Sequence, residues 1–361
     1  MMATPRSVLV VVPRRIGDVL LATPLIRSFR RGWPGATVDA LVFDGTEGIL
    51  AANADLRAVL TVPERPRPGE HAAFLARLWR RYDLAVSVMP GDRPTLYAWV
   101  AGKRRAGTLI ADGKSRWKRA LLDAWVPFDD LDTHTVRMNL RLAELLGVEP
   151  VPEVVAAWTA QDEAKVRSLL PLIGKGQPFG LLHVSPMFAY KQWHDPGWAE
   201  LAARLTDRGL AVVLTGGPAS EEQAYVRRLL AALPPRTVNV AGQLSLAQVS
   251  FLASVAKLYV GPDTAVTHIA AATGTAVVAL YGPSNPVKWG PWPKGHAGGN
   301  PFALRGSRTV GNVTLLQGET HCVPCLEEGC ERHVRSLSDC LQHMPAARVI
   351  AAVESLLESK I

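Results

Sequence analysis

The sequence predicts an α/β protein with two doubly wound parallel sheets, and three observations support this fold class. Short runs of β-branched residues alternate with longer segments of helical periodicity in both halves of the chain, which is typical of βαβ units. The chain has 361 residues, 48% of them hydrophobic, whereas a single core rarely grows beyond about 250–300 residues. Polar or glycine-containing motifs follow several predicted strands, where ligand loops leave a doubly wound sheet.

The first domain is expected to span residues 1–160. Strands are predicted at residues 8–12, 37–42 and 84–88. Apolar residues at helical spacing predict one helix over residues 18–31, and Trp33-Pro34-Gly35 is expected to end it.

The second half of the chain repeats this rhythm. Strands are predicted at residues 180–184, 211–215, 237–240, 257–260 and 276–280, with helices such as 198–207 and 221–232 between them. Proline and glycine are frequent at residues 147–152 and 172–178. We therefore expect a linker region at residues 161–178 and a second domain at residues 179–361, with a cysteine-rich segment at 321–343 and a C-terminal helix.

The charge of the chain favours an anionic partner. Lys and Arg number 40 against 32 Asp and Glu, a formal net charge of +8, but this alone does not choose among nucleic acid, phospholipid and a phosphorylated small molecule. Most of the excess lies in a basic window, residues 93–119, which contains a single acid, Asp112. Its eight basic residues are Arg93, Lys103, Arg104, Arg105, Lys114, Arg116, Lys118 and Arg119.

No targeting segment stands out in the sequence. The apolar run at residues 8–12 is too short for an export signal and stops at Pro13, and no stretch approaches the roughly 18–20 apolar residues that span a bilayer. We therefore expect a cytoplasmic protein that touches a membrane at most from its surface.

The first candidate catalytic residue is Asp18, in the turn between the first predicted strand and the first helix. A carboxylate there lies at the end of the sheet where ligands bind and suits a general base. The alternative is that Asp18 only caps the helix. A dinucleotide fingerprint is disfavoured, because the turn has one glycine, Gly17, where that motif needs three.

Two further loops could bind phosphate and ribose. Ser185 and Lys191 follow the strand at 180–184, and backbone amides with one ammonium can share the charge of a phosphate. The alternative is a surface loop with a solvated lysine. After the strand at 211–215, Gly216-Gly217 leads to Glu221 and Glu222, which either bind ribose hydroxyls or complement a helix dipole.

The strongest single motif follows the strand at 257–260. Asp263 and Thr264 can cap a helix whose free amides suit a diphosphate, and His268 lies four residues after Thr264 on the same face. A structural role for this histidine remains the alternative. Asp130-Leu131-Asp132 imitates a metal-binding motif, but we expect an acidic loop there.

Four cysteines lie within nineteen residues, as Cys322, Cys325, Cys330 and Cys340. In a reducing compartment such clustering favours a structural metal such as zinc over disulfides or buried reduced thiols. The spacing is not that of a standard zinc ribbon, so all three alternatives stay open.

Four motifs together resemble one family. These are the Ile16-Gly17-Asp18 turn, Lys191-x-Trp193, the helix with Asp263, Thr264 and His268, and the turn Tyr281-Gly282-Pro283-Ser284. In this order and spacing they resemble the lipopolysaccharide heptosyltransferases of glycosyltransferase family 9, over nearly the whole chain. The stretch from Tyr281 to Trp292 looks most like the heptosyltransferase III branch.

The resemblance implies a GT-B fold, in which two doubly wound Rossmann-like domains face a central cleft. It implies an inverting heptosyltransferase that uses ADP-heptose as donor and an inner-core lipopolysaccharide as acceptor, and that needs no metal for catalysis. In this family Asp18 would match the catalytic base and Lys191 the lysine that binds the donor phosphate. The implied donor-binding residues are Ser185, Glu221 (with Glu222 as the alternative register), Asp263, Thr264 and His268.

The same resemblance gives the basic residues a use. An anionic glycolipid would be held at the cytoplasmic face of the inner membrane by the N-terminal domain, through Arg14, Arg15, Lys103, Arg104 and Arg105. We expect a monomer that binds no nucleic acid. The alternatives are another sugar-nucleotide transferase of the family, and a non-catalytic protein that binds anions or nucleic acid.

Overall fold

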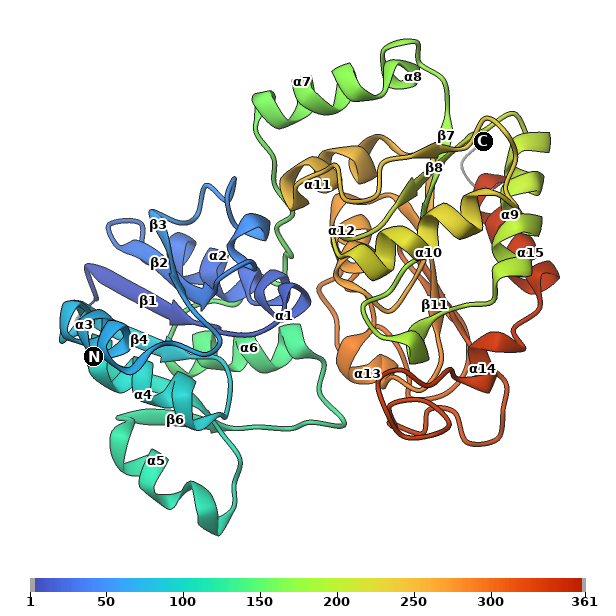
Figure 1. The fold of residues 1–361 in the computed structure, drawn as a ribbon. Coiled ribbons are helices and arrows are strands. Elements are labelled where there is room, and N and C mark those ends of the chain that lie inside the picture. The colour runs from blue at the N-terminus through green and yellow to red at the C-terminus, as the bar shows by residue number, and fades with distance from the viewer. Residues whose placement is uncertain (1–3, 359–361) are drawn as a thin grey trace. The chain divides into compact units, whose positions relative to one another are not determined.

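The computed structural model describes residues 4–358 and divides into two compact units. The N-terminal unit ends at Ala157 and the C-terminal unit begins at Trp158. Each unit contains a mainly parallel sheet with helices packed against it, as Figure 1 shows. Within residues 4–358, no helix is long and apolar enough to cross a membrane.

The N-terminal unit has a six-stranded sheet in the order β3-β2-β1-β4-β5-β6, and all its pairs are parallel. Its strands are β1 (Ser7–Val11), β2 (Thr37–Phe43), β3 (Ala58–Val62), β4 (Tyr82–Ser87), β5 (Gly102–Leu109) and β6 (Ala124–Pro127). Its helices are α1 (Ile16–Leu21), α2 (Thr23–Gly32), α3 (Pro68–Leu78), α4 (Asp92–Ala101), α5 (Arg116–Leu121) and α6 (Thr135–Leu145), with short 3-10 turns η1 (Glu47–Ile49) and η2 (Gly113–Ser115).

The C-terminal unit has a seven-stranded sheet in the order β12-β13-β11-β10-β7-β8-β9, in which only the β12–β13 pair is antiparallel. Its strands are β7 (Phe179–His183), β8 (Ala211–Thr215), β9 (Val238–Asn239), β10 (Leu258–Pro262), β11 (Ala276–Tyr281), β12 (Arg308–Val310) and β13 (Val313–Gln317). Its helices are α7 (Ala160–Leu169), α8 (Pro171–Gly174), α9 (Asp195–Asp207), α10 (Ser220–Leu230), α11 (Leu246–Val255), α12 (Ala265–Thr273), α13 (Pro286–Trp289), α14 (Asp339–Gln342) and α15 (Ala346–Glu358), with the 3-10 turn η3 (Ala189–Lys191).

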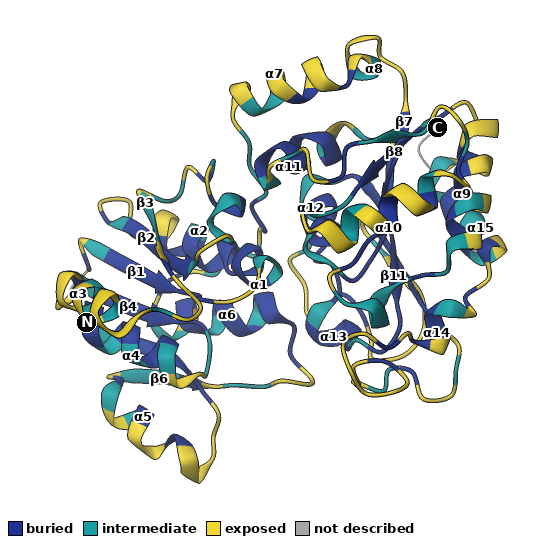
Figure 2. Ribbon diagram, viewed as in Figure 1, coloured by how far each residue is buried: buried dark blue, intermediate teal, exposed yellow. Residues whose placement is uncertain are grey.

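The central strands are buried on both faces, which is why they read as continuous apolar runs in the sequence. Residues 8–11 of β1 and all residues of β11 are buried (Figure 2). In each sheet the winding reverses beside the first strand of the unit, between β1 and β4 and between β7 and β10. Ligands of doubly wound sheets bind at such switch points, on the side where the strands end, here called the carboxyl side.

The predicted strands of both halves are found within one or two residues of their expected bounds, but the helix at 18–31 is two helices. Ala22 separates α1 from α2, because Pro24 stands in the first turn of α2 and favours a helix start there. Five strands had not been expected, namely β3, β5, β6, β12 and β13. Strand β5 begins Gly-Lys-Arg-Arg, and this charged start hides it from an apolar pattern.

Residues 161–178, for which we expected a linker, contain α7 and α8 within the C-terminal unit. Thr159 and Asp162 form a capping box at the start of α7. The Gln248 side-chain amide donates to Asp162 (3.3 Å), and Trp158 packs edge-on against Phe251 of α11. These contacts attach the segment to α11.

Candidate active site

Asp18 lies on the carboxyl side of the N-terminal sheet, in the first turn of α1 directly after β1. The N-cap position belongs to Arg15, whose side chain forms no capping hydrogen bond, so Asp18 is not the N-cap residue of this helix. Its side chain is 8% exposed, and the Arg14 Nε lies 3.8 Å from Asp18 Oδ2. Arg14 and Arg15 are both exposed, on the same side of the sheet as Asp18.

The three other predicted acceptor contacts, Lys103, Arg104 and Arg105, lie elsewhere. They belong to the first half of β5, where Arg104 is level with Leu84 and thus with Val8, at the start of β1. Residues that pair in neighbouring parallel strands lie at the same distance from the ends of the sheet. These three residues therefore lie toward the amino side of the sheet, away from Asp18. The structure therefore does not bring them together with Asp18.

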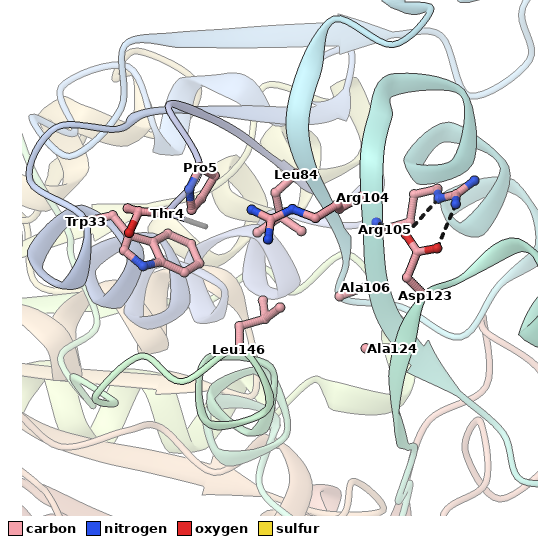
Figure 3. Close-up of a pocket in the computed structure, with 10 residues that line it drawn as sticks. All are labelled: Thr4, Pro5, Trp33, Leu84, Arg104, Arg105, Ala106, Asp123, Ala124 and Leu146. Atoms are coloured by element: carbon pink, nitrogen blue, oxygen red, sulfur yellow. Dashed lines mark hydrogen bonds and ion pairs between the residues drawn. The ribbon is translucent and has the colours of Figure 1, made fainter. Parts of the chain in front are cut away.

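Two of these three residues, Lys103 and Arg105, form ion pairs with aspartates, and Arg104 lines a small cavity. The Lys103 ammonium lies 3.0 Å from Asp83 and holds the pKa of that carboxyl below its usual value. Arg105 forms a two-pronged ion pair with Asp123, at 2.7 and 3.1 Å. Figure 3 shows this pair beside Arg104 in the lining of a small cavity of about 100 Å³.

The C-terminal unit brings two predicted donor residues into direct contact at its switch point. Lys191 comes from the loop after β7 and Asp263 from the loop after β10, and the Lys191 Nζ lies 2.5 Å from Asp263 Oδ2. The Asp263 side chain is 8% exposed and that of Lys191 20%. Seventy-two positions separate the two residues in the sequence, so only the fold unites them.

Asp263 is the centre of a buried polar network. Burial alone would raise the pKa of this carboxyl, but Lys191 and His268 hold the pKa below its usual value. The Tyr281 hydroxyl lies 3.2 Å from Asp263 Oδ1 and donates more closely to the Trp289 carbonyl, at 2.6 Å. Burial beside Asp263 raises the pKa of Tyr281 well above its usual value, so the hydroxyl stays protonated. Tyr281 was noted in the sequence only as part of a turn motif, and its contact with Asp263 could not be read there.

Helix α12 presents its N-terminus next to this network. Thr264 occupies the N-cap position, and its side chain forms no capping hydrogen bond to the first-turn amides. His268 lies one turn further, with Nε2 4.0 Å from Asp263 Oδ1 and with Nδ1 buried and without a hydrogen-bond partner in the structure. Free amides at a helix start, one ammonium and a polarised imidazole together suit a diphosphate.

Two histidines near the donor site are kept neutral by burial, and this makes stability depend on pH. Burial lowers the pKa of His183 and of His268 to about 4. Below pH 6.5 the unfolded chain therefore binds protons that the folded chain does not accept, and stability falls on acidification. Between pH 7 and pH 5 we expect each histidine to lower the free energy of unfolding by about 2 kcal/mol.

Denaturant unfolding at pH 7 and pH 5 checks this expectation. The His183→Gln variant should lose about half of the combined effect, because glutamine does not titrate, can still reach the Thr215 hydroxyl that His183 contacts at 3.0 Å, and removes no charge at pH 7. An unchanged pH dependence in this variant would show that His183 is not buried in the neutral form.

The two remaining donor candidates lie on the same side of the C-terminal sheet. Ser185 is 4% exposed and follows β7. Glu221, in the first turn of α10, is exposed, whereas its neighbour Glu222 is half-buried and accepts the Gly217 amide at 2.8 Å. Burial raises the pKa of Glu222, partly offset by that hydrogen bond. Of the two predicted registers, Glu222 is therefore the one whose carboxylate contacts the glycine turn.

The four cysteines are free thiols, which excludes the disulfide alternative for this structure. Cys340 is buried, and burial together with the other three cysteines raises the pKa of its thiol to about 12, whereas Cys322 and Cys330 are exposed. Among residues 4–358, no three or more His, Cys, Asp or Glu side chains have an arrangement that could hold a metal ion. This geometry does not support the predicted zinc site, and it also leaves Asp130 and Asp132 without a metal-binding arrangement.

Comparisons with known proteins show what the chain is similar to. A model of glycosyltransferase family 9 (heptosyltransferase) matches residues 81–298. Lipopolysaccharide heptosyltransferase 3 of Escherichia coli is 26% identical over 353 residues, covering 95% of this chain and 97% of the relative.

Solved structures agree with this match at the level of the fold. A family 9 glycosyltransferase of Veillonella parvula aligns with a TM-score of 0.79 and 17% identity, covering 98% of this chain and 97% of the other. The E. coli ADP-heptose lipopolysaccharide heptosyltransferase II aligns with a TM-score of 0.76 and 21% identity, covering 98% and 99%. The expected GT-B fold with two Rossmann-like sheets is thereby confirmed. Because the family model covers more than half of its length, the chain belongs to glycosyltransferase family 9, the heptosyltransferase family.

Proposed function

We propose that this protein is an inverting heptosyltransferase that transfers heptose from ADP-L-glycero-D-manno-heptose to the inner core of lipopolysaccharide. The observation that carries the proposal is the contact of Lys191 with buried Asp263 beside the uncapped start of α12. Such a site offers one ammonium and several backbone amides to a diphosphate. Relatives that match over nearly the whole chain are named as lipopolysaccharide heptosyltransferases, which supports heptose as the sugar.

In the proposed reaction, Asp18 accepts the proton of an acceptor hydroxyl as that oxygen attacks the anomeric carbon of the donor. The bond from this carbon to the diphosphate breaks, and ADP leaves with the electron pair. Lys191 and the α12 amides stabilise the negative charge on the leaving diphosphate, so catalysis needs no metal. Attack opposite the leaving group inverts the anomeric centre, through a transition state with oxocarbenium character.

The remaining donor contacts follow from the same site. We propose that Ser185 and Thr264 donate hydrogen bonds to the diphosphate, and that His268, neutral and aligned by Asp263, binds beside them. Glu222 is our candidate for the ribose hydroxyls, because its carboxylate is half-buried and fixed by the Gly217 amide. This assignment moves the ribose contact from Glu221 to its neighbour.

A matched pair of variants separates the two registers. Glu222→Gln is expected to weaken ADP binding by roughly tenfold or more, because a hydrogen bond to a charged group contributes about 1.5–3 kcal/mol. Glu221→Gln removes the same charge from an exposed neighbour and should change affinity less than twofold. Isothermal titration calorimetry measures the ADP affinity of both variants. A larger loss of affinity in Glu221→Gln would identify Glu221 as the ribose contact.

The acceptor is proposed to be an anionic glycolipid, with Arg14 and Arg15 as the basic contacts that share the carboxyl side with Asp18. Lys103, Arg104 and Arg105 are left out of this set because of their place in β5. We further propose a cytoplasmic monomer that works at the inner face of the inner membrane.

The decisive test is release of ADP from ADP-heptose in the presence of heptosylated core acceptor. Turnover with ADP-heptose, and at most weak turnover with UDP- or GDP-sugars, is the expected result. Turnover with another nucleotide sugar alone would favour a different transferase of the family. Binding of anions or nucleic acid without turnover of any nucleotide sugar would contradict the proposal.

A further inference from the structure

An exposed segment of the N-terminal unit, residues 110–117, combines apolar and basic side chains. Ile110 is 46% exposed and Trp117 48%, although both are large and apolar. Between them, Lys114 and Arg116 are exposed, and neither forms a salt bridge within residues 4–358. Figure 2 shows exposed stretches on α5, which begins at Arg116, interrupted by the buried Lys118.

This segment leaves the sheet on the carboxyl side. Val11 of β1 pairs with Ser87 of β4, and Ser87 pairs with Gly107 of β5. Residues beyond the end of β5 at Leu109 therefore lie on the side from which the loop to Asp18 also departs. The exposed segment and the proposed base thus belong to one side of the unit.

The backbone of the segment is anchored, so its exposed side chains have a defined support. The Asp112 carboxylate accepts the Ser115 amide at 2.9 Å and begins the 3-10 turn η2. The buried Lys118 ammonium binds Asp92 at 2.9 Å and the Pro90 carbonyl at 3.1 Å, which ties α5 to the start of α4. These contacts use the inward-facing residues and leave Lys114, Arg116 and Trp117 to solvent.

We propose that residues 110–117 form a docking surface for a lipid bilayer with anionic headgroups. A tryptophan beside lysine and arginine suits the interface of such a bilayer, where the ring lies at the headgroups and the cations meet their phosphates. Nucleic acid fits less well, because residues 110–117 offer one ring, that of Trp117, whereas single-stranded nucleic acid is bound by several aromatic side chains in succession. The proposal rests on the proposed function only in that a glycolipid acceptor lies in a membrane.

The charges of the basic window support this choice of surface. Lys103 is compensated by Asp83, Arg105 by Asp123 and Lys118 by Asp92, within the described part of the chain. Lys114 and Arg116 form no salt bridge among residues 4–358 and neighbour exposed apolar side chains, and with the exposed Asp112 counted, residues 110–117 carry a net charge of +1. Their attraction to an anionic surface is worth roughly a fivefold gain in affinity for each residue.

Vesicle flotation of the full-length protein tests this proposal without donor or acceptor, and so independently of the transferase activity. We expect binding to phosphatidylcholine vesicles that contain phosphatidylglycerol, and much weaker binding to phosphatidylcholine alone. The variant Lys114→Ser/Arg116→Ser/Trp117→Ser should lose roughly tenfold or more of this binding. Its melting temperature and its affinity for ADP should match those of the unmodified protein, which shows that both units stay folded.

The chain offers a matched control at the opposite side of the same sheet. Arg77, Trp79 and Arg81 are exposed, with Trp79 at 55%, and their replacement by serine likewise removes one tryptophan and two positive charges. This control should float like the unmodified protein. Equal flotation of the 114/116/117 variant and the unmodified protein, or an equal loss in the control, would overturn the proposal. If the 114/116/117 variant lost binding to a single-stranded oligonucleotide while its flotation was unchanged, the surface would be assigned to nucleic acid instead.

Discussion

Asp18→Asn is expected to lower kcat by about a hundredfold to ten-thousandfold, the range that a positioned general base contributes. Asparagine keeps the shape of the side chain but cannot accept the proton of the attacking hydroxyl. ADP affinity should stay within about twofold, because the proposed donor contacts belong to the C-terminal unit. Steady-state ADP release and calorimetric ADP titration measure the two quantities.

Asp44→Asn is the matched control for this prediction. Asp44 is an exposed aspartate that follows β2, on the same side of the same sheet as Asp18, and its replacement changes the net charge equally. Its kcat should remain near that of the unmodified enzyme. Full turnover in Asp18→Asn, or an equal loss in Asp44→Asn, would show that Asp18 does not act as the base.

Lys191→Met is expected to lower kcat/KM by about a hundredfold to a thousandfold, the loss typical when one charge-stabilising group is removed. The ammonium would no longer meet the charge that grows on the leaving diphosphate. The same change leaves buried Asp263 without its cation, and breaking a buried pair costs about 3–5 kcal/mol of stability. The thermal unfolding temperature should therefore fall together with activity.

The double variant Lys191→Met/Asp263→Asn separates the two effects. It removes the unpaired buried charge, so the unfolding temperature should recover while turnover stays low. Recovery of turnover along with stability would mean that Lys191 acts only through folding. ADP release assays and thermal denaturation of the single and double variants decide between these outcomes.

Much of the fold could be predicted because the central strands are buried on both faces. Residues 211–215 form a continuous apolar run, and β8 has these same bounds. Strand β5 escaped prediction because its charged start forms ion pairs at the amino side of the sheet, where polar side chains are tolerated. Apolar periodicity reports burial, so it cannot find a strand that begins in solvent.

The site was predictable in its residue types and less so in its contacts. Asp263, Thr264 and His268 are local in sequence, and the helix that follows Asp263, begins after Thr264 and contains His268 is found where it was expected. The choice between Glu221 and Glu222 depends on the first turn of α10, because neighbouring positions on a helix point about 100° apart. No local sequence pattern contains that rotation, whereas the structure shows that the Glu222 carboxylate is the one that contacts the Gly217 amide.

The contact between Lys191 and Asp263 has a consequence for ligand discrimination. A lone lysine beside a helix start would attract any small anion in the cell, including inorganic phosphate. Here the ammonium already has Asp263 as its partner, so an incoming anion must compete with a carboxylate that is held in place. Free phosphate can offer only its own charge in that competition, whereas under the proposed function a nucleoside diphosphate would gain from the helix amides and a ribose contact as well. We therefore expect the ion pair to disfavour small anions that make no further contact.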